Sequence, residues 1–499
     1  MRQLRALVGL RWQMVRDRRI RVGLALLALS LPALVVTVGV AGQLAPEKAF
    51  AFNVLLLAPS LFLGFAALSI AGPLSSGGGN ELYPHEQLVA FPVRPSTVYL
   101  ATLAAAPLNL AWAIQVVSLA AATSFVSDRG PLVLLSEITT LLYVVSATVI
   151  GQSLAWAVVG LRQTRAGRLL TLVLGLSLIG GLAVVVAAHS GTALLDRAPT
   201  TGIVLTAIQV SQGHWGPWAV TAVAMALVSA AAVALGVRAC AWATRQPNDS
   251  NRVQEARRQT RRAPATSVLT ALLRTDRASV WRSAPLRRGL FLLAILPGVV
   301  AAGVRVPWPS LPLLPGLVAA GAGLLFGVNA FCLDGSGSLW LASLPHAPAR
   351  ALLSKAAVTA EACLVAVLLA IGTATVRAPA TPTAAELTAL VGSIVSCTAI
   401  VVASCMRLSV ERPHRADLRG PRDAPAPPAT MAVYSLRLAL STTTLGLLFS
   451  AAAVSGLWPV SVVLAGFALG GAVMSLRSTG MSWRDEAIRA RVVFVVSSG

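Results

Sequence analysis

The composition of this 499-residue chain excludes most classes of soluble protein. Hydrophobic residues make up 56% of it and charged residues 12%, and its mean hydropathy is +0.76, which is more apolar surface than one soluble core needs. The net charge of +22 would indicate nucleic-acid binding if basic and aromatic residues were interleaved along one stripe, and they are not. The chain therefore belongs in a lipid bilayer, with no nucleic-acid partner.

Twelve apolar segments are long enough to cross a membrane. A hydrocarbon core about 30 Å thick needs roughly 20 helical residues for each crossing. The seventh segment is the weakest, because it is short and Pro307 and Pro309 break the pattern after it. We expect spans at residues 22–43, 50–72, 97–126, 132–161, 169–188, 217–240, 289–304, 310–332, 351–376, 386–407, 431–453 and 457–478.

The distribution of Lys and Arg tests this number of spans, because these residues are retained in short cytoplasmic loops. With both termini in the cytoplasm, 35 of the 40 lie inside or at the inner boundary. An odd number of spans would destroy this segregation. We therefore expect a multi-pass protein of the cell (plasma) membrane with both termini cytoplasmic. The outer side then carries only Lys48, Arg129, Arg197, Arg305 and Arg377.

An internal repeat relates the two halves of the chain. The stretch "RIRVGLALLALSLPALV" aligns with "RRGLFLLAILPGVV" and pairs Gly23 with Gly289. A second match, "LVAFPVRPSTVYLA" with "LASLPHAPARALLS", pairs Pro92 with Pro345. Both matches fall at equivalent places in six-span halves, which indicates two parallel repeats.

The repeat predicts the domain organisation. Residues 1–240 form a first transmembrane half that begins with an interface helix, and residues 289–499 form a second half that ends in a short cytoplasmic tail. Residues 241–288 form an Arg-rich cytoplasmic linker, in which "TSVLTALLRTDRASVW" has the pattern of an amphipathic helix at the membrane interface. The predicted fold is an all-α polytopic membrane protein, with about 12 transmembrane helices in two pseudo-symmetric six-helix halves.

Two cytoplasmic loops share one pattern, at residues 77–96 between spans two and three and at residues 333–350 between spans eight and nine, and residues 81–94 and 335–347 are their central parts. Each has a Gly/Ser-rich entry, a short apolar segment and a Pro-x-x-Pro exit, whose second proline suits the first turn of the next helix. Either these are plain connectors or, as the duplication favours, they are docking elements. The candidate contact residues are Glu81, Tyr83, Glu86, Phe91 and Arg94 in the first loop, and Leu339, Trp340, Leu344 and His346 in the second.

Motifs for catalysis are missing. A phosphate-binding P-loop needs a lysine directly after glycine, and neither Lys48 nor Lys355 follows one. His85 lies near Glu81 and Glu86, but a zinc site usually takes at least three ligands, so we expect no metal. The cysteines show no Cys-x-x-Cys spacing. We expect a chain that is not an enzyme and that binds no cofactor itself.

Charged side chains inside the spans are few. A charge at the centre of a membrane helix costs about 2.5 to 3.5 kcal/mol, so Glu137 in span four and Glu361 in span nine stand out. With Asn109 and Gln115 in span three they are candidates for a substrate path, and the alternative is that nearby hydroxyl groups satisfy them. Lys355 lies near the inner boundary, where its long side chain can extend to the headgroups.

The order of an interface helix, two spans, the loop "LVAFPVRPSTVYLATLAAAP" and four more spans resembles the type-2 permease subunits of ABC exporters, here with two halves fused. The resemblance implies that both loops are coupling helices docked on a separate cytoplasmic ATPase, in two copies, which binds the ATP and Mg. It also implies a re-entrant helical element outside, before the sixth span, for which residues 189–218 leave room. The second half departs from the family pattern, because "SGLWP" leaves almost nothing between spans eleven and twelve.

The scarcity of fixed charges in the bundle predicts an amphipathic or hydrophobic substrate, such as a drug-like natural product, a lipid or an apolar peptide. The direction, out of the cytoplasm, follows from the resemblance. Two other classes stay open. A proton-coupled efflux transporter of the major facilitator type has the same number of spans, but its Gly-x-x-x-Asp-Arg-x-Gly-Arg-Arg signature is absent. A non-transporting membrane scaffold or enzyme would want an acidic or histidine cluster, or a large soluble domain.

Overall fold

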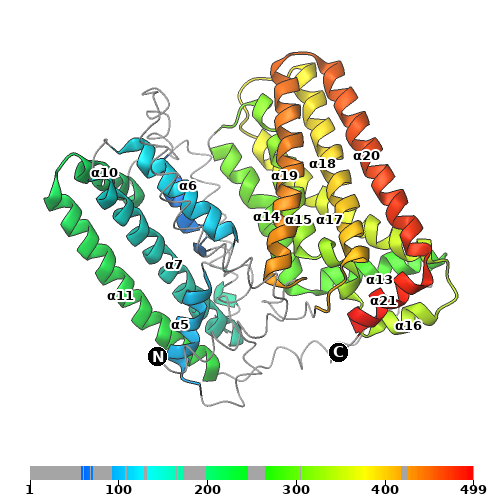
Figure 1. Cartoon of the computed structure of the whole chain (residues 1–499), viewed down its shortest axis with the longest axis horizontal. Helices are drawn as coiled ribbons and strands as arrows, with labels where there is room; N and C mark the ends of the chain where they lie inside the picture. Colours follow the sequence, from blue (N-terminus) through cyan, green and yellow to red (C-terminus); the bar gives the residue numbers. More distant parts are fainter. Residues whose placement is uncertain are drawn as a thin grey trace. The chain divides into compact units, whose positions relative to one another are not determined.

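In the computed structural model, every regular element of the described residues is a helix. The described residues are 58–59, 61–67, 69–70, 93–106, 110–127, 132–164, 166–167, 169–171, 173, 177, 198–245, 265–303, 305–416 and 425–497. Their helices fall into two compact units (Figure 1), with α5 to α11 in the first and α13 to α21 in the second.

The first unit contains helices of very different lengths. Helix α10 follows Ala198 and is too short to cross a hydrocarbon core, and the turn after it passes through Gly213, whose φ is +89°. The helices of this unit are α5 (Pro95–Ala105), α6 (Leu110–Val126), α7 (Val133–Gln163), α10 (Pro199–Ser211) and α11 (Trp215–Arg245).

The second unit is described almost without interruption. Its helices are α13 (Val268–Arg282), α14 (Ala284–Gly303), η2 (Trp308–Ser310), α15 (Leu313–Leu325), η3 (Gly327–Leu333), α16 (Gly337–Ser343), α17 (Pro348–Thr375), α18 (Ala384–Glu411), α19 (Pro428–Val454), α20 (Trp458–Arg484) and α21 (Glu486–Ser497). Helices α13, α16 and α21 lie at one end of this unit, the end at which α20 finishes (Figure 1).

Eight helical segments of the described residues are long and apolar enough to cross a membrane, which agrees with a polytopic all-α membrane protein. The weak seventh segment is among them, since α14 continues through Pro297. The eight are Val133–Leu161, Trp215–Arg245, Leu286–Gly303, Trp308–Leu333, Pro348–Thr375, Ala384–Glu411, Val433–Val454 and Trp458–Arg484.

The other expected spans are either divided or not described. The segment 97–126 is shared by α5, which ends at Ala105, and α6, which begins at Leu110. The span at 22–43 lies outside the described residues, and so do most of 50–72 and of 169–188. The total of twelve spans in two six-helix halves therefore stays a prediction.

The same kind of helix pairing recurs in both units. Helix α7 packs most extensively against α11, and α18 against α20, which are the expected fourth and sixth spans of each half. Gly236 permits the approach of α11, because a Cβ there would lie 2.5 Å from Ser153 Oγ of α7 and would collide with the ring of Tyr99. Ser153 Oγ lies 2.7 Å from the Tyr99 hydroxyl, and it is also within hydrogen-bond distance of the Ala232 carbonyl.

The span Trp308–Leu333 changes direction before it ends. Phe326, with φ −155° and ψ −24°, terminates α15, and η3 continues with a non-helical residue at Asn329. The fully buried Asn329 amide donates to the carbonyls of His414 and Pro425, at 2.7 and 2.6 Å. This anchoring between the ends of α18 and α19 holds η3 in place, and η3 delivers the chain to Asp334.

The outermost helix of each unit has an apolar surface that the unit itself leaves uncovered. In α11, only 17% of the most apolar 18-residue segment is buried, and the same share is buried in α20. Val220 and Phe467, for example, are 71% and 78% exposed. Such surfaces are stable in contact with lipid chains but not with water.

Candidate functional site

A buried group of charged side chains lies where α13, α17 and the loop before α16 meet. Lys355 Nζ lies 2.6 Å from Asp276 Oδ1 and 2.6 Å from Asp334 Oδ1, and the Ser354 hydroxyl donates to the other oxygen of Asp276. The Lys355 side chain is only 5% exposed and the two carboxylates 7%. We call these four residues the charge cluster.

The local sequence explains how α13 brings a carboxylate to this position. Ser267 caps the helix by accepting a hydrogen bond from the Thr270 amide. Leu272, Asp276 and Val280 recur every four residues and form its buried face. Asp276 therefore points from the middle of an apolar stripe towards α17, where Lys355 meets it.

The charged residues of the charge cluster are not equally important for its charge balance. Two carboxylates share one ammonium group, so removing either carboxylate leaves a one-to-one ion pair, whereas removing Lys355 leaves two buried negative charges. Burial raises the pKa of Asp334 above its ordinary value, against the lowering effect of Lys355. Lys355 does not extend to the membrane boundary as expected from the sequence, because α13 and Asp334 enclose it.

A second ion pair also joins α13 to α17. Arg277 Nε lies 2.6 Å from Glu361 Oε2, and the two side chains are 50% and 37% exposed. The structure thus places Glu361 on the face of α17 that α13 covers, next to a cation. Its role in a substrate path stays a prediction.

The second predicted docking loop contains a short helix with exposed apolar residues. Gly335, with φ +50°, turns the chain directly after Asp334, and α16 presents Leu339 and Trp340, which are 57% and 66% exposed. Leu344 and His346 follow and are half-buried. The loop is therefore held in the charge cluster at its entry and exposes apolar surface at its tip.

The two loops have the same backbone geometry where each one enters the next helix. Arg94 is the extended residue before α5 and Ala347 the extended residue before α17, and Pro95 and Pro348 lie in the first turns that follow. The expectation that the second proline of each exit begins a helix is confirmed. The other candidates of the first loop, Glu81, Tyr83, Glu86 and Phe91, lie outside the described residues.

The remaining candidates for a substrate path belong to the first unit. Glu137 on α7 accepts a hydrogen bond of 2.6 Å from Ser124 on α6, while its Oε2 is buried without a partner. Gln115 on α6 is half-buried, and Asn109 lies outside the described residues. The structure brings α6 and α7 together at Glu137, whereas Glu361 belongs to the second unit.

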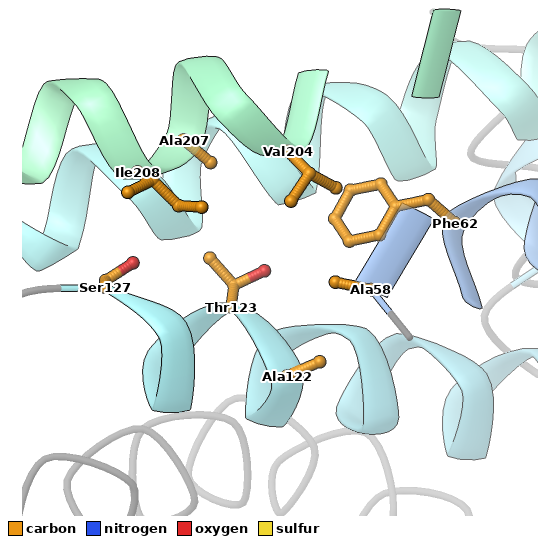
Figure 2. Close-up of a pocket in the computed structure, with 8 residues that line it drawn as sticks. All are labelled: Ala58, Phe62, Ala122, Thr123, Ser127, Val204, Ala207 and Ile208. Carbon is orange, nitrogen blue, oxygen red and sulfur yellow. The ribbon is translucent and has the colours of Figure 1, made fainter. Parts of the chain in front are cut away.

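A small pocket lies in the first unit between α6, α10 and the helical segment at residues 61–67. Figure 2 shows Phe62 and Val204 at one end of it, Thr123 on α6 and Ser127 directly after α6. Its volume is about 10 Å³, room for one water molecule. This pocket cannot hold a drug-sized substrate in the conformation described. Its lining consists of Ala58, Phe62, Ala122, Thr123, Ser127, Val204, Ala207 and Ile208.

The C-terminal segment is a further part of the site that the sequence did not indicate. A short cytoplasmic tail is expected there, and the structure shows that it contains helix α21, which packs on α16. Arg491 of α21 donates to the carbonyl groups of Val410 and Glu411 at the end of α18. Just before α21, Trp483 stacks on Phe331 at 4.5 Å and donates to the Pro348 carbonyl at 2.9 Å.

Sequence reasoning also missed Asp276, Asp334 and Ser354. One signal was available, since Asp276 interrupts the apolar stripe of an amphipathic helix that was correctly predicted. Nothing comparable marks Asp334, which looks like an ordinary turn residue beside glycine.

The chain was compared with known proteins at three levels. It matches no family model, no curated protein and no solved structure. Its function is therefore argued from its own residues and their geometry.

Proposed function

We propose that this chain is the membrane-spanning permease of an ABC-type exporter. It moves an amphipathic or hydrophobic substrate, such as a drug-like natural product, a lipid or an apolar peptide, out of the cytoplasm. Two copies of a separate cytoplasmic ATPase, which binds ATP and Mg, dock on the loops at residues 81–94 and 335–347 and supply the energy.

The observation that carries the proposal is the arrangement of the second loop. Leu339 and Trp340 are exposed at its tip, while Asp334 at its entry is ion-paired with Lys355 of α17. An exposed apolar tip is suited to a protein partner, because aromatic and apolar anchors dominate such contacts. Because the start of the loop is fixed to α17, a displacement of its tip should move α17 instead of only deforming the loop.

Two other features support the proposal. The pairing of α7 with α11 resembles that of α18 with α20, as expected for two related halves. Helix α10 is a short helix in the stretch 189–218, where the family pattern has a re-entrant element. Both termini lie in the cytoplasm in this proposal, as does the end of the second unit that carries α13, α16 and α21.

The test uses the full chain, purified from its native host membranes. In the parent we expect co-purification of a protein that hydrolyses ATP and carries a Gly-x-x-x-x-Gly-Lys-Ser/Thr phosphate loop. The double variant Leu339→Asp, Trp340→Asp should lose this protein and its ATPase activity, because the apolar contact is removed. The matched control is Val454→Asp, Leu457→Asp, which changes two exposed apolar residues at the other end of α19 and α20.

Three results would overturn the proposal. One is ATP hydrolysis by the chain alone. Another is substrate export from vesicles driven by a proton gradient without ATP, which would favour the major-facilitator alternative. The third is equal ATPase co-purification with the double variant and the parent, since residues 335–347 would then be a connector.

A further inference from the structure

A group of exposed residues at the corner between α13 and α14 has no function in the proposed exporter. Helix α13 ends at Arg282, Ser283 is extended, and α14 begins at Ala284. Trp281 is 46% exposed, and the three arginines that surround the corner are also exposed. We call Trp281, Arg282, Arg287 and Arg288 the basic corner.

The positive charge of the basic corner is not neutralised within the described part of the protein. Two carboxylates of α13 and α17 are already occupied, Asp276 by Lys355 and Glu361 by Arg277. None of the salt bridges between described residues includes an arginine of the basic corner. Three cations within seven residues therefore face the surroundings without an anion from the described part of the protein.

The position of two of these arginines on α14 adds to the requirement for an anion. Arg287 and Arg288 lie at the start of α14, whose first turn contains no acidic residue. The amino end of a helix carries partial positive charge, so cations there are unfavourable unless an anion is close. An external anion would satisfy the side chains and the helix end together.

The anions closest to the basic corner are those of the lipid headgroups, because of its depth in the membrane. The apolar part of α14 runs from Leu286 to Gly303, so its first turn lies at the level of the lipid headgroups. The indole of Trp281 favours the same level, because tryptophan prefers the boundary between hydrocarbon and water. Val280 belongs to the hydrophobic core of the unit and Leu272 is also buried, which fixes α13 and holds the basic corner rigidly at that boundary.

We propose that the basic corner is a binding site for anionic lipid headgroups. Arg282, Arg287 and Arg288 receive the phosphate of a lipid such as phosphatidylglycerol, and Trp281 lies beside the lipid glycerol. This inference needs only the membrane location of the chain, so it stands or falls separately from the proposed transport function.

The experiment measures how strongly the full chain prefers anionic lipid. The purified protein is placed in nanodiscs of phosphatidylcholine that contain a small fraction of fluorescent phosphatidylglycerol or fluorescent phosphatidylcholine, and energy transfer from the protein reports the lipids in contact. The parent should prefer phosphatidylglycerol. The variant Arg287→Gln, Arg288→Gln should weaken this preference by about fivefold for each arginine removed, because each basic residue near an anionic surface contributes on the order of 1 kcal/mol.

Two further variants make the result specific. Arg305→Gln, Arg377→Gln removes the same charge at the opposite ends of α14 and α17, and should keep the parent's preference. Arg287→Lys, Arg288→Lys keeps the charge and should retain most of it. Size-exclusion profiles identify any variant that fails to fold.

Several outcomes would overturn the proposal. The parent could show no preference between the two lipids. The two glutamine variants could lose preference equally, which would assign the effect to net charge. Inorganic phosphate at millimolar concentration could displace the anionic lipid from the parent, which would identify a site for a free anion instead of a lipid.

Discussion

Lys355 of α17 and Asp276 of α13 form a buried ion pair, with Nζ and Oδ1 2.6 Å apart and both side chains less than a tenth exposed. The pair joins an amphipathic helix to a membrane span. Asp334 joins it from the entry of the second loop, at the same distance from Lys355. The loop, α13 and α17 thus meet at a single ammonium group.

Replacement of Lys355 by methionine should strongly destabilise the second unit. Two buried carboxylates would lose their shared cation, and breaking a buried pair in this way costs about 3 to 5 kcal/mol. The measurement is thermal unfolding of the full chain in detergent. Arg407→Met is the control, since the ion pair of Arg407 with Glu411 is about half-exposed and worth less than about 1 kcal/mol. Equal melting temperatures for the two variants would contradict a buried charge cluster.

The variant Asp334→Asn should leave stability nearly unchanged but separate ATP hydrolysis from transport. Lys355 keeps Asp276 as its counter-ion, so we expect a change within about 1 kcal/mol. The ion pair between the loop and α17 is lost, so displacement of α16 should no longer reach the span. The measurement compares ATPase and transport rates of the reconstituted complex. Unchanged transport per ATP hydrolysed would show that Asp334 does not transmit motion.

The stability of the protein should depend on pH through Asp334. Its pKa in the folded protein is raised above the ordinary value of 3.8, so the folded state holds this proton more tightly than the unfolded state does. The resulting stabilisation is complete below about pH 4 and is lost as the pH rises through the raised pKa. The melting temperature of the parent relative to Asp334→Asn should therefore fall as the pH rises from about 4 through the raised pKa of Asp334. A constant difference over this range would exclude a raised pKa.

Gly236→Ala should destabilise the first unit. The added Cβ would approach Ser153 Oγ to 2.5 Å and overlap the ring of Tyr99, and such overpacking typically costs about 1 to 3 kcal/mol. Gly216→Ala in the same helix is the matched control, because its Cβ would meet nothing within 4 Å. The readout is thermal unfolding of both variants. If Gly216→Ala were the more damaging, the close packing of α7 and α11 at Gly236 would be disproved.

Trp483→Ala should loosen the start of α17. The substitution removes the stacking on Phe331 at 4.5 Å and the hydrogen bond to the Pro348 carbonyl. Amide hydrogen exchange at residues 348–355 should become faster, because the local free energy of opening falls. Trp458→Ala serves as the control, since Trp458 is 53% exposed. No change in exchange at these residues would mean that other contacts hold the helix.

Local features of the chain could be determined from the sequence by itself. The eight apolar helices of the described residues lie where the length of the apolar runs predicts them, because crossing a membrane depends on consecutive residues. The first-turn positions of Pro95 and Pro348 and the amphipathic helix α13 follow from equally short patterns. The resemblance to ABC permeases and the docking role of the loops are not tested by these local features.

Only the tertiary structure decided which polar groups meet. The side chain of Lys355 was expected to extend to the lipid headgroups, yet it is buried and pairs with Asp276, 79 residues away, and with Asp334, 21 residues away. Glu361 was grouped with Glu137 from sequence, yet it pairs with Arg277 across a helix interface. The physical reason is that a charge in an apolar setting is stable only beside its counter-ion, and the distance between two such residues depends on how the helices pack, which no short stretch of sequence encodes.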